Sequence, residues 1–221
     1  MFSQVATAAA DVLVGKIKNA KVASAIELPS RYENITPKWL SAILCTSVPG
    51  AEVVAFRLDE EDPGTSNRRR VFVDYNQEGQ DANLPDSIFC KATMGFVNRI
   101  ALGLTRGIHN EVIFFNQMRP DLNITTPRSL FASYDPKTLN SFIALEDLGN
   151  EVEFCLPSTY IDRAKAESMV DVLARLHGHY YENENLESIR SQMKTWGDYF
   201  YDNARNLNLK KYTDKGFGAA R

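Results

Sequence analysis

The sequence predicts an α+β fold in which a five-stranded antiparallel sheet with one inserted helix is followed by a helical region. Three observations support this fold class. Five segments before residue 147 have the alternating apolar pattern and the β-branched or aromatic composition of strands. Between the third and the fourth segment, apolar residues recur every three or four positions, as in a helix. After Gly149 the strand pattern stops and helical spacing takes over.

The size and composition of the chain are those of an ordinary globular protein. It has 221 residues, of which 44% are hydrophobic and 24% charged. The formal net charge of −3 argues against a broad nucleic-acid-binding surface, and no apolar run reaches the roughly 20 residues that span a bilayer. We therefore expect no nucleic-acid partner and no membrane partner. Three irregularly spaced cysteines indicate packed, reduced thiols in a cytoplasmic protein: Cys45, Cys90 and Cys155.

Residues 1–35 are predicted to form a helical extension that precedes the sheet. Within this extension, residues 5–22 can place an apolar stripe on one side of a helix, made of Val5, Ala9, Val12, Leu13 and Ile17. A transit peptide would also be amphipathic, but this segment lacks arginine and contains an aspartate. A second helix is expected over residues 36–46, because Thr36 can cap it and Pro37 suits its first position. The apolar stripe of this helix contains Trp39, Leu40, Ile43 and Leu44.

The first three strands are predicted over residues 52–58, 70–75 and 87–93. One face of the second strand is apolar and consists of Val71, Val73 and Tyr75. Polar residues 59–67 are interpreted as the turn between the first two strands, and a loop with glycine, asparagine and proline separates the second from the third. These three strands are therefore expected to form an antiparallel meander.

A helix is predicted over residues 97–118, and two further strands follow at residues 129–134 and 141–146. The apolar stripe of this helix contains Ile108, Val112 and Phe115. The connection between the two strands has proline at its second position, which is typical of a tight turn. Beyond the sheet, helices are expected over residues 159–181 and 186–207.

One group of residues indicates binding of a nucleotide. Gly64, Thr65 and Ser66 form a polar turn that can direct backbone N–H groups at phosphate oxygens. Lys91 on the third strand supplies a positive charge to the same phosphates, and Glu111 on the helix, 20 residues later, can hold the ammonium in place. This order of strand, turn, strand, lysine and glutamate is typical of proteins that bind a nucleoside triphosphate.

Each of these residues also has a purely structural interpretation. Lys91 could be a solubilising charge on an edge strand, and Glu111 a solvated charge on a helix. Asp147 is better interpreted as a cap for the turn after the last strand than as a catalytic group. The arginine run at residues 68–70 could be a phosphate-binding patch, but charge runs at strand entrances are mostly solvated, and we assign it no role.

The order of the elements and three motifs resemble a known family. The motifs are LPDSIFCK at residues 84–91, NE at residues 110–111 and IALEDLG at residues 143–149. With them, the chain resembles the aminoglycoside phosphotransferase and choline kinase superfamily, a protein-kinase-like group, nearest its ecdysteroid-kinase-like (CHK kinase-like) branch. The resemblance covers about residues 36–181 and includes LARLH, which matches a family helix that ends in Leu-His.

This resemblance implies an ATP-dependent phosphotransferase, or kinase, that acts on a small-molecule hydroxyl group. Residues 36–146 would form a protein-kinase-like nucleotide-binding N-lobe, and residues 147–221 the hinge and an incomplete helical C-lobe. The backbone around Glu146 and Leu148 would hydrogen-bond the adenine. The residues assigned to the ATP site are Gly64, Thr65, Ser66, Lys91, Glu111, Glu146 and Leu148.

The catalytic loop of the family, HGDxxxxN, has only a weak counterpart. Asp198 and Asn203 match its spacing, but Trp196 stands where the family has histidine. Apolar residues around them recur at helical spacing, whereas a catalytic loop needs a backbone free of helical hydrogen bonds. We therefore expect the chain to end before the catalytic aspartate, the asparagine and the metal-binding aspartate, and we assign no metal ligand.

Such an N-terminal portion would be inactive alone and would bind Mg²⁺ only when the rest of the C-lobe is supplied. It would also leave apolar faces of its last helices uncovered. Two alternatives stay open: a non-catalytic, pseudokinase-like fragment that binds a nucleotide or a partner, and a gene-model fragment without function of its own. The sequence does not specify the acceptor.

Overall fold

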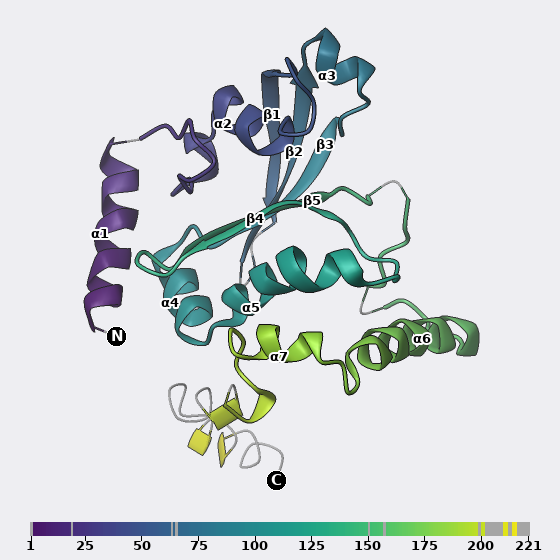
Figure 1. Ribbon diagram of the computed structural model, residues 1–221. Coiled ribbons are helices and arrows are strands. Elements are labelled where there is room, and N and C mark those ends of the chain that lie inside the picture. Colours follow the sequence, from purple (N-terminus) through teal and green to yellow (C-terminus); the bar gives the residue numbers. More distant parts are fainter. Residues whose placement is uncertain are drawn as a thin grey trace.

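The computed structural model describes residues 2–18, 20–62, 64, 66–149, 151–156, 158–198, 200–201, 210–211 and 214–215 of the chain (Figure 1). Its centre is a five-stranded antiparallel sheet with the strand order β1-β2-β3-β5-β4. The strands are β1 (Val53–Asp62), β2 (Asn67–Tyr75), β3 (Ser87–Ala92), β4 (Ser129–Asp135) and β5 (Asn140–Glu146). The predicted α+β class with five antiparallel strands is confirmed.

The first hairpin is longer than the sequence predicts. A polar turn is expected over residues 59–67, but β1 and β2 both extend into this stretch. Acidic residues at the end of β1 face arginines at the start of β2: Asp62 pairs with Arg68, and Glu61 with Arg69. Opposite charges on facing strands stabilise the ladder, so these polar residues lengthen the hairpin. The other strand ends lie within one residue of their predicted positions.

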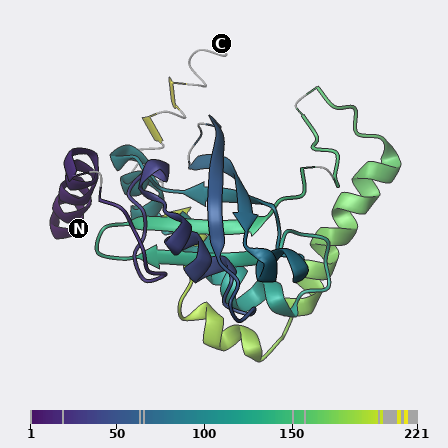
Figure 2. The ribbon, with the colours of Figure 1, turned by 90° about the horizontal axis from the view of Figure 1, so that it is seen from above.

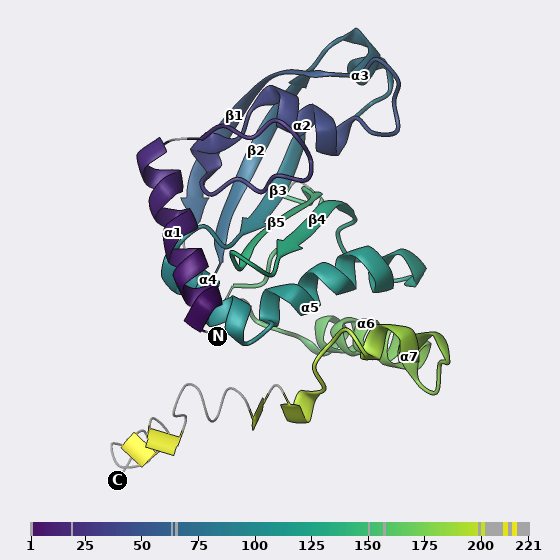
Figure 3. The same ribbon diagram turned by 60° about the vertical axis from the view of Figure 1, so that its left-hand side comes forward.

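Helices cover both faces of the sheet. In β5, Phe142 and Ala144 belong to a hydrophobic cluster that also contains the buried residues of α2 (Pro37–Leu44). Ile143 and Leu145 alternate with them and belong to a second cluster with residues of α5 (Gly107–Ile113). Because successive side chains of a strand point to opposite faces, α2 and α5 lie on opposite sides of the sheet (Figure 3).

The helix α2 begins where the sequence predicts. Oγ1 of Thr36 accepts a hydrogen bond from the Trp39 N–H (3.1 Å), and Pro37 lies in the first turn. Trp39 is fully buried and packs edge-to-face on Phe142, with the ring centroids 5.0 Å apart. The whole predicted stripe is buried: Trp39, Leu40, Ile43 and Leu44.

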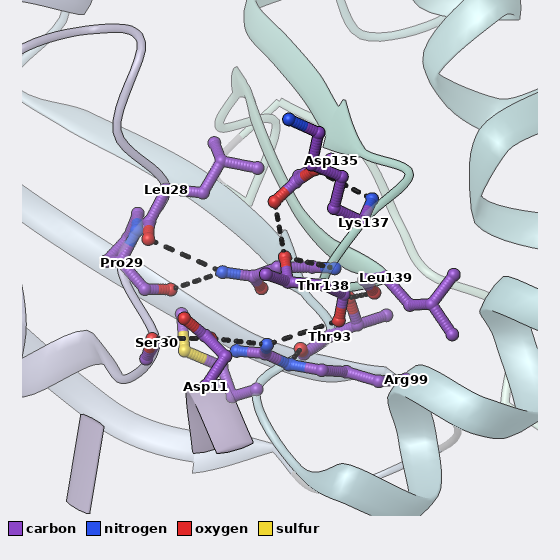
Figure 4. A network of polar contacts seen from close by, with 12 residues as sticks. Asp11, Leu28, Pro29, Ser30, Thr93, Arg99, Asp135, Lys137, Thr138 and Leu139 are labelled. Atoms are coloured by element: carbon purple, nitrogen blue, oxygen red, sulfur yellow. Dashed lines mark hydrogen bonds and ion pairs between the residues drawn. The ribbon is translucent and has the colours of Figure 1, made fainter. Parts of the chain in front are cut away.

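The segment before α2 consists of one helix and a stretch that packs in the main core. Asp11 holds α1 (Phe2–Lys18) in place, since its carboxylate accepts hydrogen bonds from Arg99 Nη1 (2.6 Å) and Ser30 Oγ (2.9 Å). Arg99 is fully buried, and its Nε donates to the Thr93 carbonyl (3.0 Å), so the ion pair joins α1 to the end of β3 (Figure 4). Downstream of α1, three buried residues join the α2 cluster: Val22, Tyr32 and Ile35.

Two short helices lie outside the predicted elements. The 3₁₀ helix η1 (Tyr32–Asn34) precedes α2. The helix α3 (Gln77–Asp81) lies in the β2–β3 connection, where Oδ1 of Asn76 caps it by accepting a hydrogen bond from the Gly79 N–H (3.2 Å).

The single helix predicted over residues 97–118 is divided in two. The helix α4 (Phe96–Leu104) is followed by Arg106 in the left-handed conformation (φ 58°), and α5 begins directly after it. A left-handed residue ends a right-handed helix, so the chain changes direction here. The new direction packs the predicted stripe against β5 and buries Ile108, Val112 and Phe115. A π-helical turn (Phe114–Met118) and a 3₁₀ turn (Arg119–Asp121) complete the connection.

After β5, the described residues form helices and irregular segments. The helix α6 (Arg163–Tyr180) begins later than predicted, because Asp162 caps it by accepting a hydrogen bond from the Lys165 N–H (2.8 Å). The helix α7 (Asn185–Arg190) has 6 residues, so the helix predicted over residues 186–207 is not continuous. The helices α1 and α6 lie at opposite ends of the sheet, α1 on the left and α6 on the right of Figures 1 and 2. Among the described residues, no helix combines the length and apolar character needed to cross a bilayer.

The three cysteines are unpaired. Cys45 and Cys90 are buried, as the sequence predicts, and burial raises the pKa of both thiols. Cys155 is exposed, and the prediction that it is packed is wrong. The reason is its position in the irregular connection between β5 and α6, which lies at the surface.

Candidate functional site

A cavity of about 850 Å³ lies between the sheet, α5 and the chain that follows β5. Its walls come from parts of the sequence that are far apart: the β1–β2 turn, β2, β3, the start of α5, and residues 145–148. Six of the predicted site residues line it, namely Gly64, Ser66, Lys91, Glu111, Glu146 and Leu148. Thr65, the seventh, lies outside the described residues.

Lys91 lies on a central strand and contacts Glu111. In the sheet register, Lys91 pairs with Arg68 of β2 and with Ile143 of β5, so it is not a charge on an edge strand. Its Nζ donates a hydrogen bond to Oε1 of Glu111, and the two side chains are 25% and 28% exposed. A charge-assisted hydrogen bond of this kind fixes the ammonium, and the remaining exposure leaves it accessible to a ligand.

The packing of α5 directs Glu111 toward β3. The helix is anchored by a cluster with β5 that contains Ile108, Val112, Phe115, Ile143 and Leu145. Glu111 is three residues from Ile108 on the helix and therefore lies on the same side as the anchoring residues. Its carboxylate is thus a paired group at the edge of the buried face, which excludes the alternative of a freely solvated charge.

The β1–β2 turn borders the cavity through Gly64 and Ser66. A Cβ atom at position 64 would lie 3.2 Å from Nη2 of Arg68 and 3.5 Å from the Ser66 carbonyl oxygen, so a side chain here would be a close fit. Glycine therefore leaves room for the Arg68 guanidinium beside the turn.

The residues at the end of β5 and just after it line one end of the cavity. The Glu146 N–H donates to the Arg128 carbonyl (2.9 Å), and the Arg128 guanidinium, hydrogen-bonded to the Glu146 carboxylate, holds the pKa of that group below its ordinary value. The Leu148 carbonyl accepts from the N–H groups of Glu151 (2.9 Å) and Val152 (3.2 Å). Leu148 lines the cavity, and its N–H has no hydrogen-bond partner among the described residues, so this group can serve as a donor to a ligand.

Asp147 links the end of β5 to the sheet. Its carboxylate accepts hydrogen bonds from Arg70 Nη2 (3.1 Å) and Nε, Ser87 Oγ (2.8 Å) and the Gly149 N–H (3.0 Å). Burial alone would raise the pKa of Asp147, but these hydrogen bonds hold the pKa below its ordinary value. The bond from Gly149 confirms the predicted cap, whereas the ion pair with Arg70 is a role that the sequence did not indicate.

The three arginines at the start of β2 point to different faces. Arg68 and Arg70 line the cavity, whereas Arg69 lies on the other face, 5.6 Å from the ring centroid of Tyr32. The expectation of a solvated run holds for Arg68, whose side chain is 40% exposed, and does not hold for Arg69 (17%). Strand alternation is the signal that could have found this, because the opposite, buried face of β2 carries Val71, Val73 and Tyr75.

Asp198 lies outside the cavity, in the helical residues 196–198. It accepts a hydrogen bond from Thr195 Oγ1 (2.7 Å), and its N–H donates to the same oxygen (3.2 Å), as in a helix cap. Asn203 lies outside the described residues. Within the described part of the chain, no group of three histidine, cysteine or carboxylate side chains gathers in a way that could hold a metal ion.

No family model, no curated protein and no solved structure matches this chain. The class of ligand is therefore inferred from the chemical groups that line the cavity. One end offers a fixed ammonium beside a turn of small residues, and the other offers a free backbone N–H beside the apolar side chains of Phe89 and Leu145. These groups suit a ligand that joins an anionic part to a flat heterocycle.

Proposed function

We propose that this chain provides the nucleotide-binding lobe of an ATP-dependent phosphotransferase (kinase) that acts on a small-molecule hydroxyl group. One observation carries the proposal: the Lys91–Glu111 pair, the β1–β2 turn and the stretch from Glu146 to Leu148 line the same cavity. Protein kinases use a lysine on the third strand, a glutamate on the packed helix and a glycine-containing loop to bind the phosphates of ATP. Residues 36–146 are then a kinase-like N-lobe, and residues 147–221 the hinge and the start of a helical C-lobe.

The two ends of the cavity suit the two ends of ATP. The Leu148 N–H can donate to the edge of the adenine, and Phe89 and Leu145 offer apolar surface to its faces. Lys91 and the β1–β2 turn are placed for the phosphate oxygens. The volume of about 850 Å³ lies in the range of small-molecule sites, roughly 300 to 1,000 Å³.

A second candidate function is nucleotide or partner binding without phosphoryl transfer, as in a pseudokinase. The position of Asp198 favours it, because this residue caps a helical turn with Thr195 and does not line the cavity. Transfer requires an aspartate that orients the acceptor hydroxyl and further groups that hold Mg²⁺. In the first proposal, these groups and the acceptor site are not among the residues that line the cavity.

Binding of ATP to the 221-residue chain tests the proposal. Calorimetric titration should give a measurable Kd for the wild type, and Lys91→Met should raise it about 10- to 100-fold, as expected for one charge-assisted hydrogen bond. Lys38→Met is the matched control, since it removes the same charge from an exposed lysine of α2, on the other face of the sheet. A wild type that does not bind ATP, or a Lys91→Met variant that binds it equally well, would overturn the proposal.

The formation of ADP tests whether this chain alone carries out transfer, which the second candidate function excludes. The chain is incubated with ATP, Mg²⁺ and a mixture of glycerol, choline and glucose as hydroxyl acceptors, with Lys91→Met as the blank. ADP formation above this blank indicates that the chain retains transfer. Tight ATP binding without ADP formation agrees with both candidate functions, because the first one does not place the catalytic groups in this cavity.

A further inference from the structure

The strand β2 adds two arginines to the cavity wall beside Lys91. Arg68 and Arg70 both line the cavity, and the sheet register places them at two levels. At one level Arg68 pairs with Lys91, and at the other Arg70 pairs with Phe89, which itself pairs with Leu145 of β5. Positions two residues apart along a strand are separated by about 7 Å. Arg68 therefore belongs to the phosphate end of the proposed site, and Arg70 to the adenine end.

The two arginines differ in how firmly the protein holds them. Arg70 binds Asp147 through two nitrogens, and the Asp147 side chain is only 8% exposed. Moving Arg70 toward a ligand would leave this carboxylate buried without its main partner, which is costly. A Cβ atom on Gly149 would lie 2.3 Å from Nη2 of Arg70, so the chain is also tightly fitted around this guanidinium. Arg70 is therefore a structural cation.

Arg68 is held only loosely. Its Nη2 pairs with Oδ2 of Asp62 (2.9 Å), and the two side chains are 40% and 62% exposed. Exposed ion pairs contribute little to stability, so this one can exchange its carboxylate for another anion. In addition, Nε of Arg68 is buried and has no hydrogen-bond partner among the described residues. The guanidinium therefore has a weakly bound partner to release, and a movement of the side chain away from Asp62 would let the unpaired Nε–H meet another acceptor.

We propose that Arg68 is a second phosphate-binding cation, which acts together with Lys91 on the polyphosphate chain of a nucleoside di- or triphosphate. This inference rests on the nucleotide site proposed above. On binding, Arg68 exchanges the Asp62 carboxylate for phosphate oxygens, to which a guanidinium can donate two parallel hydrogen bonds. The glycine at position 64 leaves the space beside the turn that this requires. Arg68 thus makes the site selective for the length of the phosphate chain.

The test compares the Kd of ATP, ADP and AMP by calorimetry. In Arg68→Gln, binding of ATP and ADP should weaken about tenfold or more, while binding of AMP changes less than about twofold. Arg57→Gln is the matched control, because it removes the same charge from an exposed β1 arginine that lies over Phe72 and does not line the cavity. It should leave all three Kd values unchanged. Thermal melts of each variant check that the fold is retained.

A second variant, Asp62→Asn, should bind ATP more tightly than the wild type, a result that a purely structural role for Arg68 does not predict. Asp62→Asn frees Arg68 from its carboxylate and should tighten ATP binding about two- to fivefold, the effect of one exposed ion pair. In the Arg68→Gln background, the effect of Asp62→Asn should be smaller, because only the direct repulsion between Asp62, which lines the cavity, and the phosphates is then removed.

The outcomes separate this inference from the proposed function. If the wild type binds no ATP, the nucleotide site itself is wrong. If Lys91→Met loses ATP binding and Arg68→Gln does not, the site stands and the role of Arg68 is overturned. Equal losses for ATP and AMP in Arg68→Gln would also overturn it, since they would indicate a general effect on the cavity.

Discussion

Asp147 joins three segments of the chain at the wall of the cavity. Arg70 lies on β2, Ser87 on β3, and the Gly149 N–H in the connection after β5, and all three donate hydrogen bonds to its carboxylate. A carboxylate that is 8% exposed is stable only with such partners. The residue therefore attaches the chain that follows β5 to the sheet and positions the neighbouring Leu148 N–H.

Asp147→Asn should lower the free energy of unfolding at neutral pH by about 1.5 to 3 kcal/mol, because it replaces charged hydrogen bonds by neutral ones. The folded-state pKa of Asp147 is lowered, so this contribution is present above the ordinary aspartate pKa of about 4 and is lost as the pH falls through the folded value. The free energies of unfolding of wild type and variant, measured in urea, should thus differ by a constant amount at about pH 5 to 7. The difference should shrink at lower pH.

The control for this experiment is Asp74→Asn, at an exposed position of β2. Its unfolding free energy should stay within about 0.5 kcal/mol of wild type. A difference between wild type and Asp147→Asn that grows on acidification would contradict the assigned role of the ionised carboxylate.

Among the helices, α1 is attached to α4 through a buried charge. Arg99 of α4 is 0% exposed, and Asp11 of α1 is the carboxylate that neutralises it. The remaining bonds of the guanidinium go to backbone carbonyls of Thr93 (3.0 Å) and Thr138 (3.4 Å). The helix α4 leads directly into α5, and α5 carries Glu111. By holding α4 in place, α1 therefore supports the position of α5 and of the Lys91–Glu111 ion pair.

Asp11→Ala should destabilise the protein by about 3 to 5 kcal/mol, since it leaves the Arg99 guanidinium buried without a counter-charge. The double variant Asp11→Leu with Arg99→Met should be markedly more stable than Asp11→Ala, because it removes both charges. Chemical denaturation followed by circular dichroism measures the stability of the single and the double variant. Thr7→Ala, at an exposed position of α1, is the control and should change stability by less than about 0.5 kcal/mol. A small effect of Asp11→Ala would mean that α1 is not attached in this way.

Local signals made most elements predictable. Strand alternation located the five strands, and the Thr36 cap located the start of α2. The Lys91–Glu111 pair was also predictable, because the order of the elements brings a helix directly after the third strand. The apolar pattern did not reveal the break at Arg106, whose left-handed conformation divides the predicted helix in two.

Pairs that depend on tertiary packing were not predictable. Asp11 and Arg99 are 88 positions apart, and Arg70 and Asp147 are 77 positions apart. Nothing in the local pattern of either partner indicates which distant charge it meets. The role of Arg68 also follows only from the register, which places it opposite Lys91.

Across the whole molecule, apolar surface is distributed unevenly. The sheet and α2 enclose a continuous core, whereas α6 has no buried residue. Its exposed apolar side chains include Met169 (50%), Val170 (62%) and Leu173 (52%), in agreement with the expectation of an uncovered face. The contact of α6 with the rest of the chain includes one hydrogen bond from Tyr180 to the Met118 carbonyl (3.0 Å).

Stability should therefore depend on the sheet region and hardly at all on the exposed face of α6. Leu173→Gln should change the free energy of unfolding by less than about 0.5 kcal/mol, whereas Leu40→Ala, in the α2 core, should cost about 2 to 5 kcal/mol. Leu173→Gln should also leave the Kd for ATP unchanged, because α6 does not line the cavity. Denaturant unfolding and calorimetry of the two variants check both points. A loss of stability in Leu173→Gln as large as that in Leu40→Ala would show that α6 belongs to the cooperative core, and the nucleotide site would then depend on the helical region as well as on the sheet.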